Sequence, residues 1–185
     1  GHRLEGIWHS GSQMGAIISL FRGMYMRTPR NMTKAAGFYN TLLDSDEPAL
    51  IVECLNGYRL KEKLPSNIGS FKTPIGVVET VKEGSDLTVV SYGSTLRIVQ
   101  EVAQELMAVG INIEIIDAQS LLPFDLNHDV VKSVQKTNRL LVIDEDMPGG
   151  ASAYLLQQIL DEQNAYQYLD SKPACMSAQP HRPAY

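Results

Sequence analysis

The feature that most constrains the fold is a regular alternation of apolar runs and amphipathic segments in the second half of the chain. Short apolar runs suited to buried strands occupy residues 87–92, 111–117, 140–144 and 174–178. Segments suited to helices separate them, at residues 95–109, 129–136 and 151–163. Strands that alternate with helices form parallel sheets, because each helix carries the chain back to begin the next strand. The pattern predicts an α/β fold with a mostly parallel sheet.

The first of these helices has predicted ends. Ser94 can cap its start by accepting a hydrogen bond from a free backbone N–H. Leu96, Val99 and Ala103 then lie on one face, as a helix that packs against a sheet requires. Gly110 can adopt the left-handed conformation that ends a helix.

Residues 1–55 predict a smaller α/β section. We expect a helix within residues 14–21, a short strand at 25–28, and a helix over 32–43 that Asn31 caps. An apolar run at 49–54 predicts a buried strand. Two strands are too few for a sheet of ordinary size, so this section is expected to be part of a larger domain. Residues 56–76 are rich in Gly, Pro, Ser and charge, and predict a linker before a second domain at 77–185.

Composition excludes several classes of function. Hydrophobic content of 44% and charged content of 20% are typical of a globular protein. The formal charge of −5 argues against nucleic-acid binding, and no apolar run approaches the roughly 20 residues needed to span a membrane. The start of the chain is polar and shows no leader pattern. We expect an intracellular protein in which Cys54 and Cys175 are buried free thiols.

The order of several motifs resembles one known family. In the second section these are Tyr92-Gly93-Ser94, residues 116–125, residues 136–139, and residues 142–150 with their Gly149-Gly150 pair. In the first section they are His9-Ser10 with Gln13, Pro29-Arg30-Asn31, and residues 48–53. Together they resemble beta subunits, or beta halves, of thiamine-diphosphate-dependent 2-oxo acid dehydrogenases, with residues 57–63 most similar to the branched-chain 2-oxoisovalerate type. Gln119 departs from the arginine that family members commonly carry.

The resemblance implies both a fold and a reaction. The fold is the C-terminal part of a pyrimidine-binding domain followed by a transketolase C-terminal-like domain. The reaction is oxidative decarboxylation of a 2-oxo acid, with the acyl group passing to a lipoyl arm. Thiamine diphosphate with magnesium would lie between subunits, and the partners would be an alpha subunit or half, a second beta chain and a lipoyl-bearing acyltransferase. The family's glutamate that activates thiamine would precede this chain, which is therefore expected to be inactive alone.

His9 is the candidate catalytic residue. It matches the family's active-site histidine for acyl transfer, a step that needs proton exchange near neutral pH. Without the resemblance, a histidine packed beside Trp8 is the plainer interpretation. The resemblance also implies a potassium ion held by backbone carbonyls around Leu42, Ser45 and Glu47, for which a solvated acidic loop is the alternative.

The remaining polar residues are expected to have plainer roles. The histidines and cysteines lack metal-ligand spacing, and His128 is expected to be exposed. Adjacent side chains on an extended segment point in opposite directions, so Asp144, Glu145 and Asp146 are expected to serve structure or an interface. Gly149-Gly150 predicts a tight turn where a helix starts against its neighbour.

Two other functions stay open. A transketolase or deoxyxylulose-phosphate-synthase type would need phosphate-binding residues in the second section, where Gln119 is the wrong residue. A non-catalytic subunit-interaction module belongs to a different class. If the leading interpretation is right, the compartment is the bacterial cytoplasm or the mitochondrial matrix, and one face of the protein should be unusually apolar.

Overall fold

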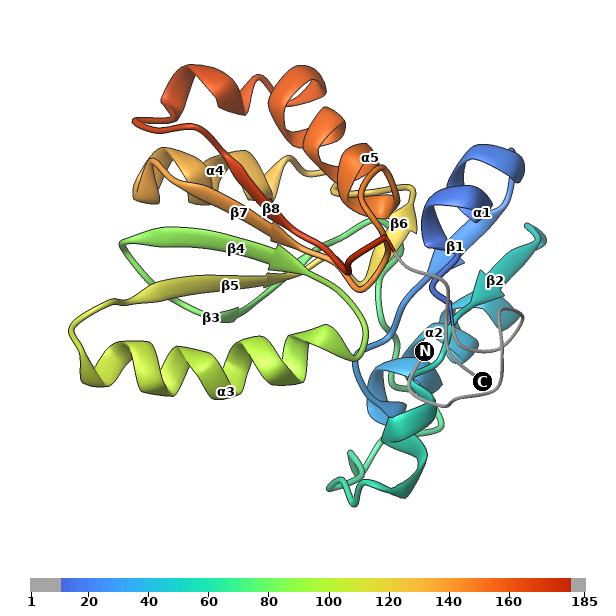
Figure 1. Ribbon diagram of the computed structural model, residues 1–185. Helices are drawn as coiled ribbons and strands as arrows, with labels where there is room; N and C mark the ends of the chain where they lie inside the picture. The colour runs from blue at the N-terminus through green and yellow to red at the C-terminus, as the bar shows by residue number, and fades with distance from the viewer. Residues whose placement is uncertain (1–10, 181–185) are drawn as a thin grey trace.

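The computed structural model describes residues 11–180 and contains two sheets (Figure 1). The larger sheet has the order β3-β5-β4-β7-β8. Its strands are β3 (Glu79–Lys82), β4 (Leu87–Ser91), β5 (Ile113–Asp117), β7 (Leu140–Ile143) and β8 (Ala174–Met176). Strands β5, β4, β7 and β8 each run parallel to the next in this order, whereas β3 pairs antiparallel with β5. The predicted α/β fold with a mostly parallel sheet is therefore confirmed, with β3 as an unpredicted edge strand.

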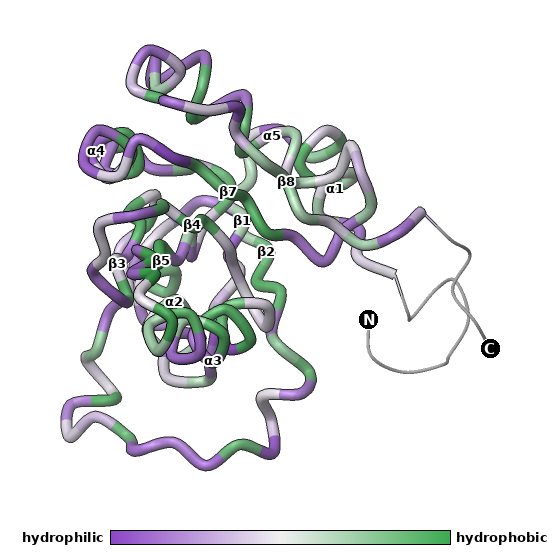
Figure 2. Tube along the Cα trace, turned by 60° about the vertical axis from the view of Figure 1, so that its left-hand side comes forward, coloured by the Kyte–Doolittle hydropathy of each residue, from purple (hydrophilic) through white to green (hydrophobic). Residues whose placement is uncertain are grey.

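Helices cover both faces of the larger sheet. Helix α3 (Thr95–Ala108) lies on one face, and α4 (Asp129–Thr137) and α5 (Ala151–Gln157) lie on the other (Figure 1). Strand β4 shows why two cores form: Val89 packs with the α3 residues and its neighbour Val90 packs with those of α4 and α5. In Figure 2 the strand β7 is green, as expected for a strand buried between helical layers.

The smaller sheet has the order β2-β1-β6. Strands β1 (Tyr25–Arg27) and β2 (Ala49–Ile51) are parallel, and β6 (Ser120–Leu122) pairs antiparallel with β1. Helices α1 (Met14–Leu20) and α2 (Met32–Leu43) belong to the same section. Because β6 comes from the second half of the chain, the two sections are joined by a strand pairing as well as by sequence.

Local predictions for the helices have mixed outcomes. Asn31 caps α2 as expected, and its Oδ1 accepts the N–H of Lys34 at 2.9 Å. Ser94 is the N-cap residue of α3 as predicted, but its side chain makes no capping bond: its backbone is helical, with φ −65° and ψ −26°, rather than extended, and its hydroxyl donates to Glu145 at 3.3 Å. Gly110 follows α3 with a φ of +83°, the left-handed conformation predicted for it.

The predicted buried strand at 49–54 is also corrected. Strand β2 is three residues long and lies at the edge of its sheet, where Ala49 is exposed. A 3-10 helix, Leu55–Arg59, runs into residues 56–76, which otherwise form irregular loops. No helix within residues 11–180 is long and apolar enough to cross a membrane.

Candidate functional site at the seam between the two sheets

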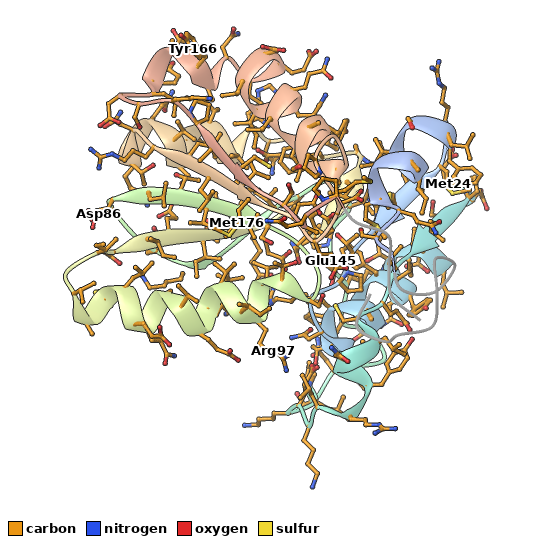
Figure 3. All side chains as sticks on the ribbon, in the orientation of Figure 1. Met24, Asp86, Arg97, Glu145, Tyr166 and Met176 are labelled. Carbon is orange, nitrogen blue, oxygen red and sulfur yellow. The ribbon has the colours of Figure 1, made fainter. Side chains whose placement is uncertain are left out.

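The carboxyl ends of the parallel strands meet the first section of the chain. Strands β4, β5 and β7 point toward the side of the molecule where α1 and α2 lie (Figure 1). We call this contact the seam; its polar residues are Arg30, Glu79, Asp117, Asp144 and Asp146 with their partners. Figure 3 places Glu145 at this contact and Arg97 at the nearby end of α3. In α/β proteins the carboxyl ends of strands are where ligand sites form.

An ionic cluster forms the centre of the seam. Arg30 Nη1 lies 2.7 Å from Asp117 Oδ2 and 2.7 Å from Glu79 Oε2, and its Nη2 donates to Glu79 Oε1 at 3.1 Å. Lys34 Nζ adds a contact of 2.6 Å to Glu79. Asp117 also accepts the N–H of Gln119 at 2.9 Å. These contacts tie the loop before α2 to strands β3 and β5.

Burial and pairing act in opposite directions on the charges of this cluster. The Asp117 side chain is 0% exposed, and burial raises the pKa of its carboxyl to about 6 although Arg30 opposes the shift. Burial also disfavours the charged forms of Arg30 and Glu79, but their hydrogen bonds outweigh it. Pairing therefore raises the pKa of Arg30 and lowers that of Glu79. No sequence pattern predicts a contact between residues 30 and 117, because the two lie 87 positions apart.

Arg27 of β1 is a second, fully buried cation. Its Nη1 donates to Ser120 Oγ at 2.8 Å and to the Leu122 carbonyl at 2.8 Å, across the pairing of β1 with β6. The rings of Tyr25 and Phe38 lie 4.7 Å and 5.8 Å from its guanidinium carbon. Burial lowers the pKa of Arg27 to about 10. Among the described residues, its Nε and Nη2 have no hydrogen-bond partner.

Two buried aspartates follow β7. Asp144 accepts the hydroxyl of Tyr92 and the N–H of Ser152 at 2.8 Å, so it organises the start of α5. Asp146 accepts the N–H of Gly15 at 3.0 Å and thereby holds α1. Glu145 between them is exposed. The expected structural role of Asp144 and Asp146 is confirmed, and Gly149-Gly150 forms the predicted turn, with a φ of +90° at Gly149.

The Cys54 thiol and the Tyr92 hydroxyl are not poised for nucleophilic chemistry. Burial raises the pKa of the Cys54 thiol to about 11, and its Sγ contacts the Pro29 carbonyl at 3.2 Å. Burial and the adjacent Asp144 raise the pKa of Tyr92. Cys54 is buried as predicted, whereas the prediction for Cys175 is wrong because Cys175 is exposed on the edge strand β8.

The predicted catalytic and metal residues have different outcomes. His9 lies outside the described residues, and the nearest described helix, α1, begins five positions later at Met14. Around the predicted potassium loop, the Leu42 carbonyl accepts the N–H of Ser45 at 3.0 Å, and Ser45 Oγ accepts the N–H of Glu47 at 3.2 Å. Potassium ligation there stays a prediction. His128 is exposed, as expected.

The ionic cluster offers no unpaired cation to the diphosphate of thiamine diphosphate. The cations of the ionic cluster are already paired with Glu79 and Asp117, so they are not free to hold a diphosphate. Within residues 11–180, no three His, Cys, Asp or Glu side chains come together as a group that could hold a metal ion. Gln119, at the position of the family's arginine, is buried and donates to the Val77 carbonyl at 3.0 Å.

Comparisons with known proteins agree with this architecture. A family model described as "Transketolase, C-terminal domain" matches residues 76–184. The beta subunit of the pyruvate dehydrogenase E1 component of Chlorokybus atmophyticus is 32% identical over 183 residues, covering 95% of this chain and 53% of that protein. The chloroplastic subunit beta-4 from Oryza sativa subsp. japonica is 35% identical over 178 residues, covering 91% and 43%.

One further relative and one solved structure of similar fold show how wide the similarity is. The beta subunit of acetoin:2,6-dichlorophenolindophenol oxidoreductase from Bacillus subtilis (strain 168) is 31% identical over 140 residues, covering 76% of this chain and 40% of that protein. A solved structure titled "Split gene transketolase, inactive beta4 tetramer" has a TM-score of 0.70 at 18% identity, covering 95% of this chain and 54% of that one.

The chain spans about half the length of the curated relatives it matches. The relatives named here act, by their names, on pyruvate or acetoin, so they support the beta-subunit resemblance but not the branched-chain type. The chain belongs to the transketolase C-terminal domain family, and its homologues include beta subunits of the first component of pyruvate dehydrogenase.

Proposed function

We propose that the chain is the C-terminal part of the beta subunit, or beta half, of a thiamine-diphosphate-dependent 2-oxo acid dehydrogenase. The observation that carries the proposal is the extent of the similarity to these beta subunits. It is not confined to one domain, because the match to one relative covers 95% of this chain. The seam supports the proposal because it holds both sections in one arrangement, as a site built from both would require. The reaction is oxidative decarboxylation of a 2-oxo acid with acyl transfer to lipoyl.

His9 is the residue of this chain that we assign to the chemistry. Thiamine diphosphate with magnesium, held between the subunits of the assembled enzyme, supplies the electron sink. The His9 imidazole would give and accept protons during acyl transfer, because histidine is the side chain whose ordinary pKa lies nearest neutrality. We expect His9→Ala to abolish acylation of lipoyl while leaving the fold intact. Unchanged acylation by this variant would remove His9 from the mechanism.

An apolar groove supports assembly with other subunits. It has a volume of about 340 Å³ and lies between α3 and the strands β4, β7 and β8. Ile98, Val102 and Met176 line it, and each is more than 40% exposed. Exposed apolar surfaces of this kind mark sites of contact with other polypeptides. The proposed partners are an alpha subunit or half, a second beta chain and a lipoyl-bearing acyltransferase.

Several finer features belong to the same proposal. We propose the domain division 1–55, 56–76 and 77–185, and a potassium ion bound by carbonyls around Leu42, Ser45 and Glu47. The compartment that we propose is the bacterial cytoplasm or the mitochondrial matrix. Plant relatives that are named chloroplastic make a plastid a third location to test.

The test is turnover by the full-length beta chain assembled with its alpha partner, thiamine diphosphate and magnesium. Pyruvate and 2-oxoisovalerate are compared as substrates, with the rate of decarboxylation as the readout. Preference for 2-oxoisovalerate would support the branched-chain type suggested by residues 57–63, and preference for pyruvate would assign the chain to the type of its named relatives. No turnover on either acid, with the cofactor shown to bind, would refute the proposal in favour of a transketolase-like enzyme.

A further inference from the structure

Residues 55–64 form an exposed loop that is held against α2, and we call it the basic loop. It begins with the 3-10 helix Leu55–Arg59 and continues without regular structure. Glu62 Oε1 accepts the N–H of Met32 at 3.1 Å, and its Oε2 accepts the N–H and the hydroxyl of Thr33 at 3.2 Å and 2.8 Å. These N–H groups belong to the first turn of α2 and have no partner within the helix. The loop is therefore docked on the start of α2.

The start of the basic loop is fixed as well. Gly57 is buried, and its N–H donates to the Cys54 carbonyl at 2.8 Å. The Tyr58 hydroxyl donates to Glu53, which also accepts the Tyr39 hydroxyl at 2.8 Å. Because the loop is anchored at both ends, the residues between the anchors are presented from a backbone that is already organised for binding.

Three cations of the basic loop have no partner within the described chain. Arg59, Lys61 and Lys63 are exposed, and no hydrogen bond or ion pair engages their side chains within residues 11–180. Other exposed cations do have carboxylate partners: Lys72, Lys132, Lys136 and Arg139. In a chain whose formal charge is −5, the basic loop is a local concentration of positive charge that the chain itself does not neutralise.

The basic loop lies beside the carboxyl ends of the parallel strands. Cys54 directly precedes it, and a Cβ on Gly93, two positions after β4, would lie 3.9 Å from Cys54 Sγ. At the other anchor, Glu62 holds Met32, which is two positions beyond Arg30 of the seam. Figure 1 shows the segment projecting beyond α2, on the side to which the strands point. A partner bound to the basic loop is therefore held next to the edge where α/β proteins form ligand sites.

The composition of the basic loop suits a protein partner that binds and leaves. The cores of permanent subunit interfaces are depleted in lysine, because an unpaired cation is unfavourable when buried. Exposed cations instead attract an acidic partner over about 8–10 Å and speed its encounter. Tyr58, Leu60 and Leu64 add exposed apolar area, which favours a polypeptide partner. The net charge of −5 opposes binding to nucleic acid or to an anionic membrane.

We propose that the basic loop docks an acidic surface of the lipoyl-bearing domain that receives the acyl group. Arg59, Lys61 and Lys63 pair with carboxylates of that domain, and the exposed apolar side chains of the loop pack beside these pairs. A domain that carries substrate must dissociate in every catalytic cycle, which a small, charge-steered contact allows. The inference rests on the proposed function, in which a lipoyl-bearing acyltransferase is a partner, and it assigns the surface that recognises this partner.

Two assays on the full-length beta chain, assembled with its alpha partner, thiamine diphosphate and magnesium, separate docking from catalysis. Acylation of the free lipoyl domain of its acyltransferase, over a range of domain concentrations, gives kcat and KM. Oxidation of the 2-oxo acid with an artificial electron acceptor reports decarboxylation without that domain. We expect replacement of Arg59, Lys61 and Lys63 by Ala to raise KM about tenfold, because each exposed ion pair contributes roughly twofold to affinity. The kcat and the rate with the artificial acceptor should stay within about twofold.

Salt and matched variants test whether charge at this place is the cause. Raising the salt concentration from about 0.05 to about 0.5 M should raise KM several-fold for the unmodified enzyme and less for the triple variant, because salt screens exposed charges. Arg59→Lys keeps the charge and should leave KM unchanged. The matched control replaces three exposed cations elsewhere, Arg22, Arg139 and Lys172, by Ala and changes the net charge equally. Its KM should stay near that of the unmodified enzyme.

The outcomes divide between the inference and the proposed function. An unchanged KM in the triple variant, or a rise equal to that of the control, would overturn the inference. So would an equal fall in both assays, or failure to assemble with the alpha partner, since either result would make the loop part of the permanent structure. If the triple variant does not fold, Lys61→Ala and Lys63→Ala alone should each raise KM about twofold, and no rise in either would overturn the inference. An unmodified enzyme inactive in both assays would instead refute the proposed function.

Discussion

Replacing Arg30 by Met is the sharpest test of the seam as a structural unit. The substitution keeps most of the side-chain volume and removes the cation that contacts Asp117 at 2.7 Å. Asp117 would stay fully buried with one remaining donor, the N–H of Gln119. Removing one partner of a buried ion pair costs about 3–5 kcal/mol, because the remaining charge is uncompensated. The remaining donor favours the lower end, so we expect a loss of about 3 kcal/mol at pH 8.

The other member of the cluster should contribute little to this loss. Glu79 is about one-third exposed and keeps Lys34 at 2.6 Å, so water and a second cation still stabilise it. Replacing Arg30 and Asp117 together, by Met and Asn, removes the stranded charge. We therefore expect the double variant to lose about 2 kcal/mol less than the sum of the two single losses, a coupling within the range for residues in contact.

The loss should depend on pH with a definite sign. Burial raises the pKa of Asp117 from 3.8 to about 6 in the folded chain, a shift worth on the order of 3 kcal/mol. A raised folded pKa contributes stability that is complete below about pH 4 and is lost as pH rises through about 6. Without Arg30 the pKa of Asp117 should rise further. The Arg30→Met penalty should then be largest near pH 8 and small near pH 4.

Urea unfolding followed by far-ultraviolet circular dichroism, at several pH values, gives the free energies. Arg139→Met is the matched control, since Arg139 and Asp170 form an ion pair that is about half exposed on both sides. Such a pair contributes at most about 1 kcal/mol. An Arg30→Met loss no larger than that of the control, or additive losses in the double variant, would show that the cluster does not couple the two sections.

Three other predictions follow from single contacts. Gly84→Ala should lower the melting temperature and reduce the free energy of unfolding by about 1–3 kcal/mol, because the alanine Cβ would lie 2.2 Å from the backbone of β5. An unchanged melting temperature would refute this packing. Tyr92→Phe leaves Asp144 without its hydroxyl donor and should cost about 1–3 kcal/mol in urea unfolding, whereas a loss below 0.5 kcal/mol would mean that the bond is not formed in solution. Maleimide labelling read by mass spectrometry should modify exposed Cys175 well before buried Cys54, whose thiol pKa is raised to about 11; equal rates would contradict that burial.

The parts of the fold that could be predicted from sequence depend on local interactions. The bounds of α2 follow from the Asn31 cap and from helical spacing, and α4 follows from its apolar spacing, because both signals lie within the element itself. Strand β3 was missed because its four residues, which are partly exposed, carry no apolar run. Ser94 occupies the predicted N-cap position of α3, but the expected side-chain bond is absent because its backbone is helical rather than extended.

The seam could not be predicted, because its partners lie far apart in sequence. Arg30 and Asp117 both fell in segments that carried the family resemblance, but nothing in their spacing indicated that they touch. The partner of Asp146 is a backbone N–H at Gly15, which leaves no trace in residue type. The expected structural role of Asp144 and Asp146 did follow from sequence. Side chains alternate along an extended segment, so these two aspartates point to the same side, where they are buried, and Glu145 points away and is exposed.

The composition of the seam indicates what it does for the fold. Apolar burial is non-directional, and two cores made of Val, Ile and Leu already stabilise the larger sheet against its helices. Between the sections, Met14 and Met26 join the larger core, and directional contacts are added to this packing: Arg30 to Asp117, Arg27 to Ser120 and Asp146 to Gly15. Directional bonds to buried groups fix the angle and register of α1, β1 and α2. They add little to the free energy of folding, because the desolvation cost of burying a charge offsets much of the attraction to its partner. A protein that needs residues from both sections at one site benefits from such an interface, since it sets the position of α1 and of the loop before α2.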